Sequence, residues 1–169
     1  MPKLGKLGLR VLKIVHLILA GLWVGGAIGL NIMVFLFSSA ESGGELYGYN
    51  IASKLVDDLL IIPGAMGCLV TGLLFSLFSN WGFFKHRWLA VKWVLTVFCI
   101  LFGTFYLGPT VNDQPAISYA EGLGALADPT WIANRLTSLK GGAIQVFLIL
   151  FMVAISVIKP WGLRKKVTS

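Results

Sequence analysis

Charged residues are scarce in this chain, and their scarcity decides the class of protein before any motif is considered. They make up 12% of the 169 residues, about half of the share that is usual in a soluble domain, whereas hydrophobic residues make up 57%. This composition excludes a soluble globular protein and predicts an integral membrane protein. The net charge of +7 would indicate a nucleic-acid ligand in a soluble protein, but here it is interpreted against a membrane, and we expect no nucleic-acid partner.

The chain also lacks the short motifs of soluble enzymes. It has no glycine-rich phosphate loop, no nucleophile elbow and no HExxH pair, so nucleotide binding and soluble-type hydrolysis have no support. Its two cysteines, Cys68 and Cys99, fall deep within apolar segments and form neither a CxxC pair nor a Cys/His ligand pattern. We therefore interpret both cysteines as core residues.

Long apolar runs are what the chain has instead. The run at 14–37 contains twenty-four residues without a formal charge, which is long enough as a helix to cross the ~30 Å hydrocarbon core of a bilayer. Together with three similar runs it predicts an all-α integral membrane protein, a four-transmembrane-helix bundle in a single domain of residues 1–169. The predicted spans are 14–37, 59–78, 88–107 and 141–158, with an extracytoplasmic loop at 108–138. Asp128 followed by Pro129 predicts that the fourth helix begins within that loop.

Basic residues are divided unevenly between the two sides of the predicted bundle. Eleven of the fourteen lie on the side of the N-terminus, whereas Lys54, Arg135 and Lys140 lie on the other side with all seven acidic residues. By the positive-inside rule both termini are cytoplasmic, which predicts a multi-pass protein of the cell (inner) membrane. Trp81 and Trp88 flank the second connection, as interfacial anchors do. The eleven inner cations are Lys3, Lys6, Arg10, Lys13, Lys85, Arg87, Lys92, Lys159, Arg164, Lys165 and Lys166.

Polar side chains inside apolar helices are costly and therefore point to function. His16 lies about one turn inside the first span, His86 stands at the cytoplasmic entrance of the third span, and Lys92 lies six residues deeper. A neutral imidazole is a good ligand for haem iron or copper, so His16 and His86 are candidate metal ligands. Three alternatives stand beside this interpretation: His86 belongs to an interfacial basic cluster, Lys92 snorkels to the surface, and His16 bonds to a neighbouring helix.

Two short motifs resemble those of a known group of membrane proteins. The string HLILAGLWVGG, which begins at His16, is similar to the first helix of small four-helix proteins that include the HemJ-type protoporphyrinogen oxidases and the CopD membrane domain. The string WLAVK, which ends at Lys92, resembles a motif in the third helix of the HemJ type. The resemblance implies a haem-associated redox protein with His16 and Lys92 as catalytic positions, and a porphyrin or a quinone as ligand. The implied residues around a b-type haem are His16, Trp23, His86 and Lys92.

A second class of function is a non-enzymatic membrane protein, either a small-solute or ion carrier or an assembly partner with a structural role. A carrier would use Asn31 and Gln145, inside the first and fourth spans, together with Asp57 and Asp58 at the outer start of the second. Interhelical hydrogen bonds by the amides and a local pair of Asp58 with Lys54 are the alternative interpretations. Small residues at 21, 25 and 29 of the first span and at 64, 68, 72 and 76 of the second predict close packing seams, and a homo-oligomer is a further candidate partner.

Overall fold

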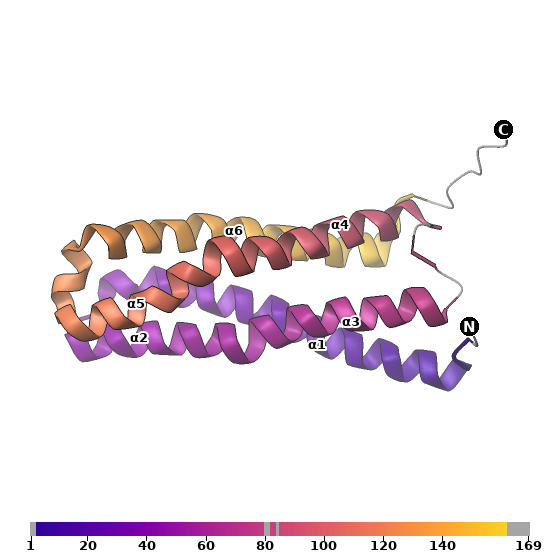
Figure 1. Cartoon of the computed structure of the whole chain (residues 1–169), viewed down its shortest axis with the longest axis horizontal. Coiled ribbons are helices and arrows are strands. Elements are labelled where there is room, and N and C mark those ends of the chain that lie inside the picture. The colour runs from indigo at the N-terminus through magenta and orange to yellow at the C-terminus, as the bar shows by residue number, and fades with distance from the viewer. Residues whose placement is uncertain (1–2, 80–81, 84, 162–169) are drawn as a thin grey trace.

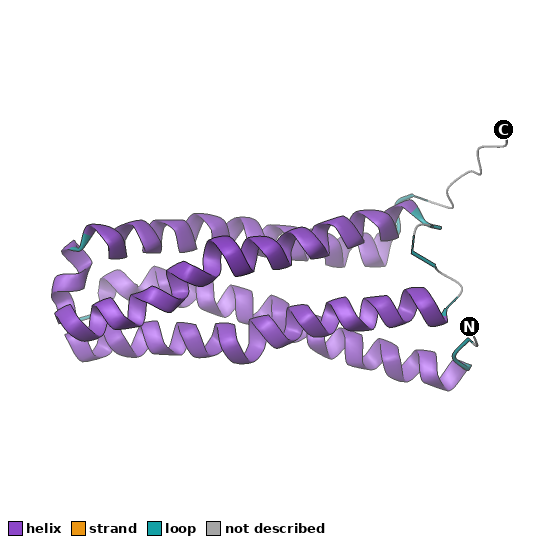
Figure 2. Cartoon of the chain, viewed as in Figure 1, coloured by secondary structure: helices purple, strands orange, loops and turns teal. Residues whose placement is uncertain are grey.

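The computed structural model describes residues 3–79, 82–83 and 85–161. Within these residues four long helical segments run side by side, with the start of α1 and the end of α6 at the same end of the bundle (Figure 1). Figure 2 shows helices joined by short loops, and the described residues contain no strand. The segments Lys6–Ser39, Gly43–Phe78, Arg87–Ala127 and Pro129–Ile158 are each long and apolar enough to cross a membrane. The predicted all-α four-helix membrane bundle is therefore confirmed.

The four segments are built from shorter helical elements. The first combines a long α-helix with a short 3-10 turn, and the fourth is a single α-helix. The second and third each contain a π-helical stretch between two α-helices, and the third ends in a 3-10 turn. In chain order the elements are α1 (Lys6–Leu36), η1 (Phe37–Ser39), α2 (Gly43–Val56), η2 (Asp57–Ile61), α3 (Ile62–Phe78), α4 (Arg87–Phe102), η3 (Gly103–Leu107), α5 (Gly108–Glu121), η4 (Gly122–Ala127) and α6 (Pro129–Ile158).

A proline follows each π-helical stretch by two residues. In η2 and in η3, the backbone N–H directly after the stretch bonds to the carbonyl oxygen of its first residue, which makes one wide turn. Pro63 and Pro109 then lie in the first turn of α3 and of α5, where a missing N–H matters least. The helices consequently continue through both prolines.

The segment 108–138 differs from the loop that the sequence predicts. Helix α5, the 3-10 turn η4 and the start of α6 occupy nearly all of it, and Pro115 lies inside α5. The polar composition of this segment does not oppose a helix, because α5 packs against α2 and buries side chains such as Ser118. Its extracytoplasmic position stays a prediction.

The helix start at Asp128 is confirmed. The Asp128 carboxylate accepts a hydrogen bond from the backbone N–H of Trp131 at 2.7 Å, and Pro129 occupies the first helical turn. Trp131 packs against Phe37 with ring centroids 5.8 Å apart. This cap reverses the chain with a single residue between η4 and α6, so the two elements become neighbours.

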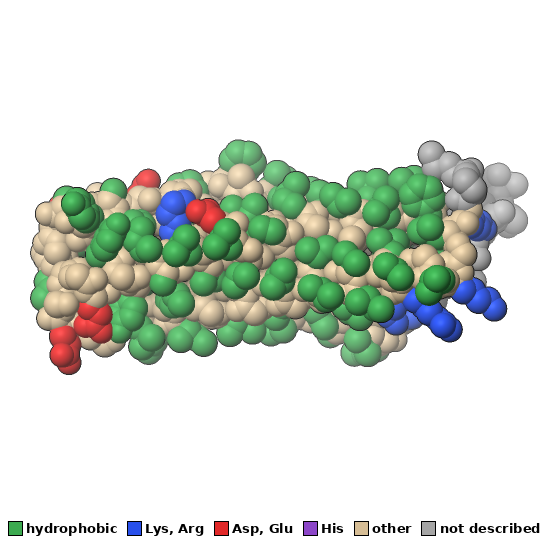
Figure 3. Space-filling view, turned by 90° about the horizontal axis from the view of Figure 1, so that it is seen from below, with side chains coloured by type: hydrophobic (Ala, Val, Ile, Leu, Met, Phe, Trp, Pro, Cys, Tyr) green, Lys and Arg blue, Asp and Glu red, His purple; other side chains and the backbone are tan. Residues whose placement is uncertain are grey.

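Charged side chains separate toward the two ends of the bundle. Figure 3 shows Lys and Arg gathered at the end where α1 begins, acidic side chains toward the other end, and apolar side chains over most of the surface between them. We name these the basic end and the acidic end. The apolar surface is in contact with the lipid bilayer. The predicted cations Arg164, Lys165 and Lys166 and the predicted anchor Trp81 lie outside the described residues.

Two clusters of buried apolar residues fill much of the interior. Cys68 and Cys99 are free thiols in the first cluster, so their prediction as core residues is confirmed. The basic-end core consists of Trp23, Ala27, Ala65, Cys68, Cys99, Ile149 and Met152. The acidic-end core consists of Leu30, Val34, Phe37, Leu46, Val111, Ala125 and Trp131.

The predicted seams are confirmed at Gly64 and not at the glycines of the first span. A Cβ atom added to Gly64 of α3 would lie 2.7 Å from the backbone nitrogen of Trp23 and 2.9 Å from the carbonyl oxygen of Leu19. A Cβ atom added at position 21, 25 or 29 would meet nothing within 4 Å. The seam between α1 and α3 therefore lies on a different face of α1 from that glycine series, and that part of the seam prediction is wrong within this chain.

Candidate functional site

A cavity of about 540 Å³ lies between the helices in the half of the bundle next to the basic end, and we name it the basic-half cavity. All four helical segments line it, with His16 and Trp23 from α1, Phe75 from α3, Lys92 from α4 and Met152 from α6. Its volume is in the range of pockets that hold small ligands and cofactors. The structure thus brings together three of the residues predicted for the site, His16, Trp23 and Lys92.

The His16 ring is held by a hydrogen bond to the neighbouring helix. Its Nδ1 atom lies 2.6 Å from the Thr71 hydroxyl oxygen, which also lies 2.6 Å from the carbonyl oxygen of Gly67. A carbonyl oxygen only accepts, so the single hydroxyl proton of Thr71 goes to Gly67. Nδ1 of His16 must then donate to Thr71, and a neutral ring has its lone pair on Nε2. Phe75 supports the ring edge to face, with centroids 5.9 Å apart.

Thr71 is the residue of the candidate site that the sequence interpretation missed. Its hydroxyl resembles the outer partner that fixes the tautomer of a metal-binding histidine. The only signal in the sequence was a polar side chain within an apolar span, followed by Gly72. That signal does not show which residue of another helix the hydroxyl faces.

Lys92 is half-buried in the lining and has no hydrogen bond or ion pair within the described part of the chain. Lys13 and Lys159 also line the cavity, and the Lys159 ammonium lies 5.9 Å from the centre of the Trp88 ring. None of the seven acidic residues is in the lining. The cavity therefore has an excess of positive charge, which favours an anionic ligand.

Trp23 belongs both to the cavity wall and to the basic-end core. The residue is 3% exposed and its indole Nε1 has no hydrogen-bond partner among the described residues. The glycine of α3 that approaches its backbone, Gly64, fixes the position of α1 at this height. Trp23 is consequently a rigid apolar wall.

His86 does not line the cavity. It lies at the N-cap of α4 with its ring centroid 6.0 Å from that of Trp88, in the connection after α3. Among the described residues, no three His, Cys, Asp or Glu side chains are grouped as metal ligands would be. The geometry places His16 in the cavity and leaves His86 at its periphery, so their use as a ligand pair stays a prediction without geometric support.

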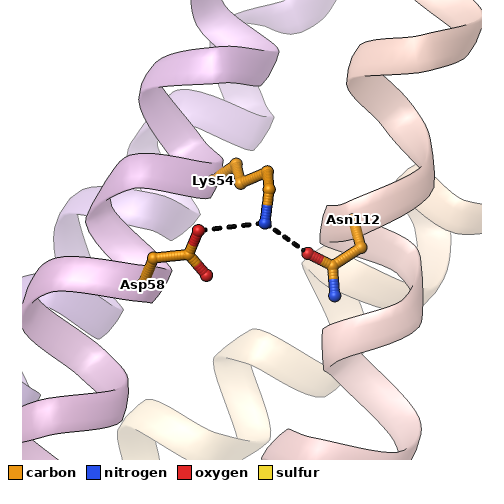
Figure 4. Close-up of polar contacts among 3 residues, drawn as sticks. All are labelled: Lys54, Asp58 and Asn112. Carbon is orange, nitrogen blue, oxygen red and sulfur yellow. Dashed lines mark hydrogen bonds and ion pairs between the residues drawn. The ribbon is translucent and has the colours of Figure 1, made fainter.

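The residues expected for a carrier separate into two groups. Asn31, Asp57 and Gln145 line a second, smaller cavity, whereas Asp58 is outside its lining. The Lys54 ammonium binds the Asp58 carboxylate at 2.9 Å and the side-chain oxygen of Asn112 at 2.7 Å, as Figure 4 shows. The predicted local pair of Lys54 and Asp58 is confirmed, and the bond of Lys54 to Asn112 ties α2 to α5.

The basic-half cavity passes a simple test of fit for a haem or porphyrin. It offers a histidine whose Nε2 is available, apolar and aromatic walls, and lysines that can balance acidic substituents. His16 would hold iron, and Lys92 and Lys13 would face the acidic groups. No acidic residue lies in the described lining to repel such a ligand.

Comparisons with known proteins place the chain in a family defined by its membrane character. No curated protein matches the chain, and no solved structure matches it. A family model described as a predicted integral membrane protein (DUF2269) matches residues 10–160, which include all four helical segments apart from the first residues of α1. The chain belongs to this family of integral membrane proteins, DUF2269.

Proposed function

We propose that this protein is a membrane redox protein that binds a b-type haem or a related porphyrin in its basic-half cavity. In this proposal His16 would bind the iron, and Lys92 would balance a propionate or another acidic group of the ligand. The observation that carries the proposal is the hydrogen bond to Thr71, which leaves Nε2 of a neutral His16 available. A bound haem would supply one-electron transfer at its iron.

The remaining lining supports a flat, conjugated and anionic ligand. Phe75, Trp88 and Trp93 provide aromatic walls. The resemblance of the His16 and Lys92 motifs to the HemJ type supports the same two positions. A quinone is the second candidate ligand for this cavity, because a lysine ammonium can donate to a quinone oxygen. A quinone gives no haem absorption band, so a spectrum separates the two ligands.

The experiment is a visible absorption spectrum of the purified protein, as isolated and after addition of haemin. We expect a b-type spectrum in the wild type and its loss in His16→Ala, because the ligand is removed while Gly64 and the helix contacts stay. His86→Ala is the matched control, since this second histidine is outside the cavity, and it should retain the spectrum. A wild type that binds no haemin, or equal haem content in His16→Ala, would remove His16 as an iron ligand.

Thr71→Val tests the hydrogen bond itself. The valine keeps the shape of threonine but leaves Nδ1 of His16 without an acceptor, so haem affinity should fall about tenfold or more and the spectrum should shift. Thr96→Val is the matched control, because Thr96 lines the same cavity but its hydroxyl contacts the Met152 sulfur at 3.4 Å. Equal changes in both variants would show that Thr71 acts only through packing.

We also propose that the basic end faces the cytoplasm and that the protein lies in the cell (inner) membrane. The support is the distribution of lysine and arginine. Tyr119 of α5 is 77% exposed near the acidic end, whereas both native cysteines are buried. A Tyr119→Cys variant should therefore react with an impermeant thiol reagent added outside intact cells. Reaction only after the cells are opened would reverse the orientation.

A further inference from the structure

We propose that Asp57, Asn31 and Gln145 form a binding site for a small monovalent cation such as Na⁺. The three side chains come from η2, α1 and α6 and line a cavity of about 40 Å³. This volume is enough for one ion or a few water molecules and too small for an organic ligand. The site is separate from the proposed haem cavity, because no residue is common to the two linings.

The negative charge of the site comes from Asp57. Its carboxylate has no hydrogen bond within the described residues, although Lys54 lies only one turn earlier. The ammonium of Lys54 is instead bound to Asp58 and Asn112 (Figure 4). The Asp57 carboxylate can therefore bind an ion in the cavity. Lys54 neutralises the adjacent carboxylate of Asp58, which is outside the cavity lining.

Two amide oxygens complete the set of oxygen ligands. Gln145 is 5% exposed, and its Oε1 atom has no hydrogen-bond partner in the part of the chain that the structure describes. A buried carbonyl oxygen without a partner is costly, and a cation in the cavity would satisfy it. Asn31 donates through Nδ2 to the carbonyl oxygen of Ala27 at 2.8 Å, so its Oδ1 remains available as an acceptor.

Two glycines make the room that these amides occupy. A Cβ atom at Gly142 would lie 2.6 Å from Oδ1 of Asn31, and a Cβ atom at Gly103 would lie 3.1 Å from Nε2 of Gln145. Gly103 is also the first residue of η3, and Asp57 is the first residue of η2. Both π-helical stretches thus begin at this cavity, and such stretches occur frequently at functional sites.

The chemistry of the ligands selects the kind of ion. Carboxylate and amide oxygens are hard ligands, and the lining contains no histidine or cysteine that would favour a transition metal. One carboxylate balances one positive charge, which favours a monovalent over a divalent cation in a membrane interior. The cation would at the same time satisfy Asp57 and the unpaired oxygen of Gln145.

The test measures thermal unfolding of the purified full chain in NaCl and in choline chloride at equal concentration. We expect Na⁺ to raise the midpoint of unfolding of the wild type, because an ion that binds only the folded protein stabilises it. In Asp57→Asn, which keeps the side-chain shape, the apparent Na⁺ affinity should fall at least tenfold. Asp113→Asn is the matched control, since it removes the same charge from an exposed position of α5 outside the cavity lining and leaves the pair of Lys54 and Asp58 intact, and it should keep the Na⁺ response.

Two results would overturn the proposal. One is an equal midpoint of thermal unfolding of the wild type in NaCl and in choline chloride. This result would mean that the cavity holds water, or that Asp57 is protonated, and that no Na⁺ binds. The other is an equal Na⁺ response in the wild type and in Asp57→Asn. Gln145→Leu provides an independent arm and should weaken Na⁺ binding without the removal of any charge.

Discussion

At the acidic end, Val34, Phe37 and Leu46 are completely buried against one another and Trp131, whereas at the basic end the helices leave a cavity of about 540 Å³ between them. The two halves are made by the same four helical segments. A tightly packed core stabilises a fold, because its side chains make van der Waals contacts on all sides, whereas side chains that line a cavity lack contacts on one side. The comparison indicates that the acidic-end core holds the bundle together and that the basic half is where a ligand can be accommodated without rearrangement.

The largest expected effect comes from a large-to-small substitution in the acidic-end core. Trp131→Ala should lower the free energy of unfolding by about 3–5 kcal/mol, because it leaves a cavity among fully packed neighbours. Trp93→Ala, in the wall of the existing cavity, should lower it by about 1 kcal/mol. Denaturation of both variants in the same detergent measures the difference, and equal losses would contradict the assignment of stability to the acidic end.

A smaller effect is expected where α1 and α3 meet. Gly64→Ala places a methyl group against the backbone of α1 and should lower the free energy of unfolding by about 1–3 kcal/mol. Gly25→Ala adds the same methyl group where nothing lies within 4 Å, so it should leave the stability unchanged or slightly higher. Thermal unfolding of the pair is the measurement. A larger loss for Gly25→Ala would mean that the glycine series at 21, 25 and 29 contacts something outside this chain.

The smallest effect concerns the charge of the basic-half cavity. Lys92→Met keeps an apolar side chain and removes the ammonium, so it should weaken haemin binding by about 1 kcal/mol, or roughly fivefold. Lys92→Arg keeps the charge and should bind haemin nearly as well as the wild type. Titration of haemin followed by absorbance distinguishes the variants. If all three proteins bind equally, Lys92 is a residue that snorkels to the membrane surface.

The parts of the fold that could be predicted are those set by local composition. Charge-free runs locate the spans, Asp128 and Pro129 locate a helix start, and Lys54 with Asp58 has the spacing of a helical pair. The span predicted at 59–78 already includes Pro63, but the continuation of the third segment through Pro109 could not be predicted, because it depends on a wide π turn before the proline. Proline alone favours a break.

The candidate site was predictable only in part for a related reason. His16 and Lys92 are conspicuous as polar residues within apolar helices, and the structure places both in one cavity. Which faces of two helices meet depends on their rotation, and the pattern of small residues does not determine it. Thr71 as the partner of His16, and the contact of Gly64 with a face of α1 other than that of Gly25, follow from that rotation.

The π-helical stretch η2 has a consequence for residues far from it in the sequence. One extra residue in a helical turn changes the direction of every later side chain by about 100° around the helix axis. Asp57 precedes this change of phase, whereas Gly64 and Thr71 follow it. Deletion of a single residue within Asp57–Ile61 would therefore turn Thr71 away from His16 while the helix stayed intact. The wide turn at η2 thus sets which side chains of one continuous helical segment reach each cavity: Asp57 before the turn lines the small cavity, and Gly72 and Phe75 after it line the cavity of His16.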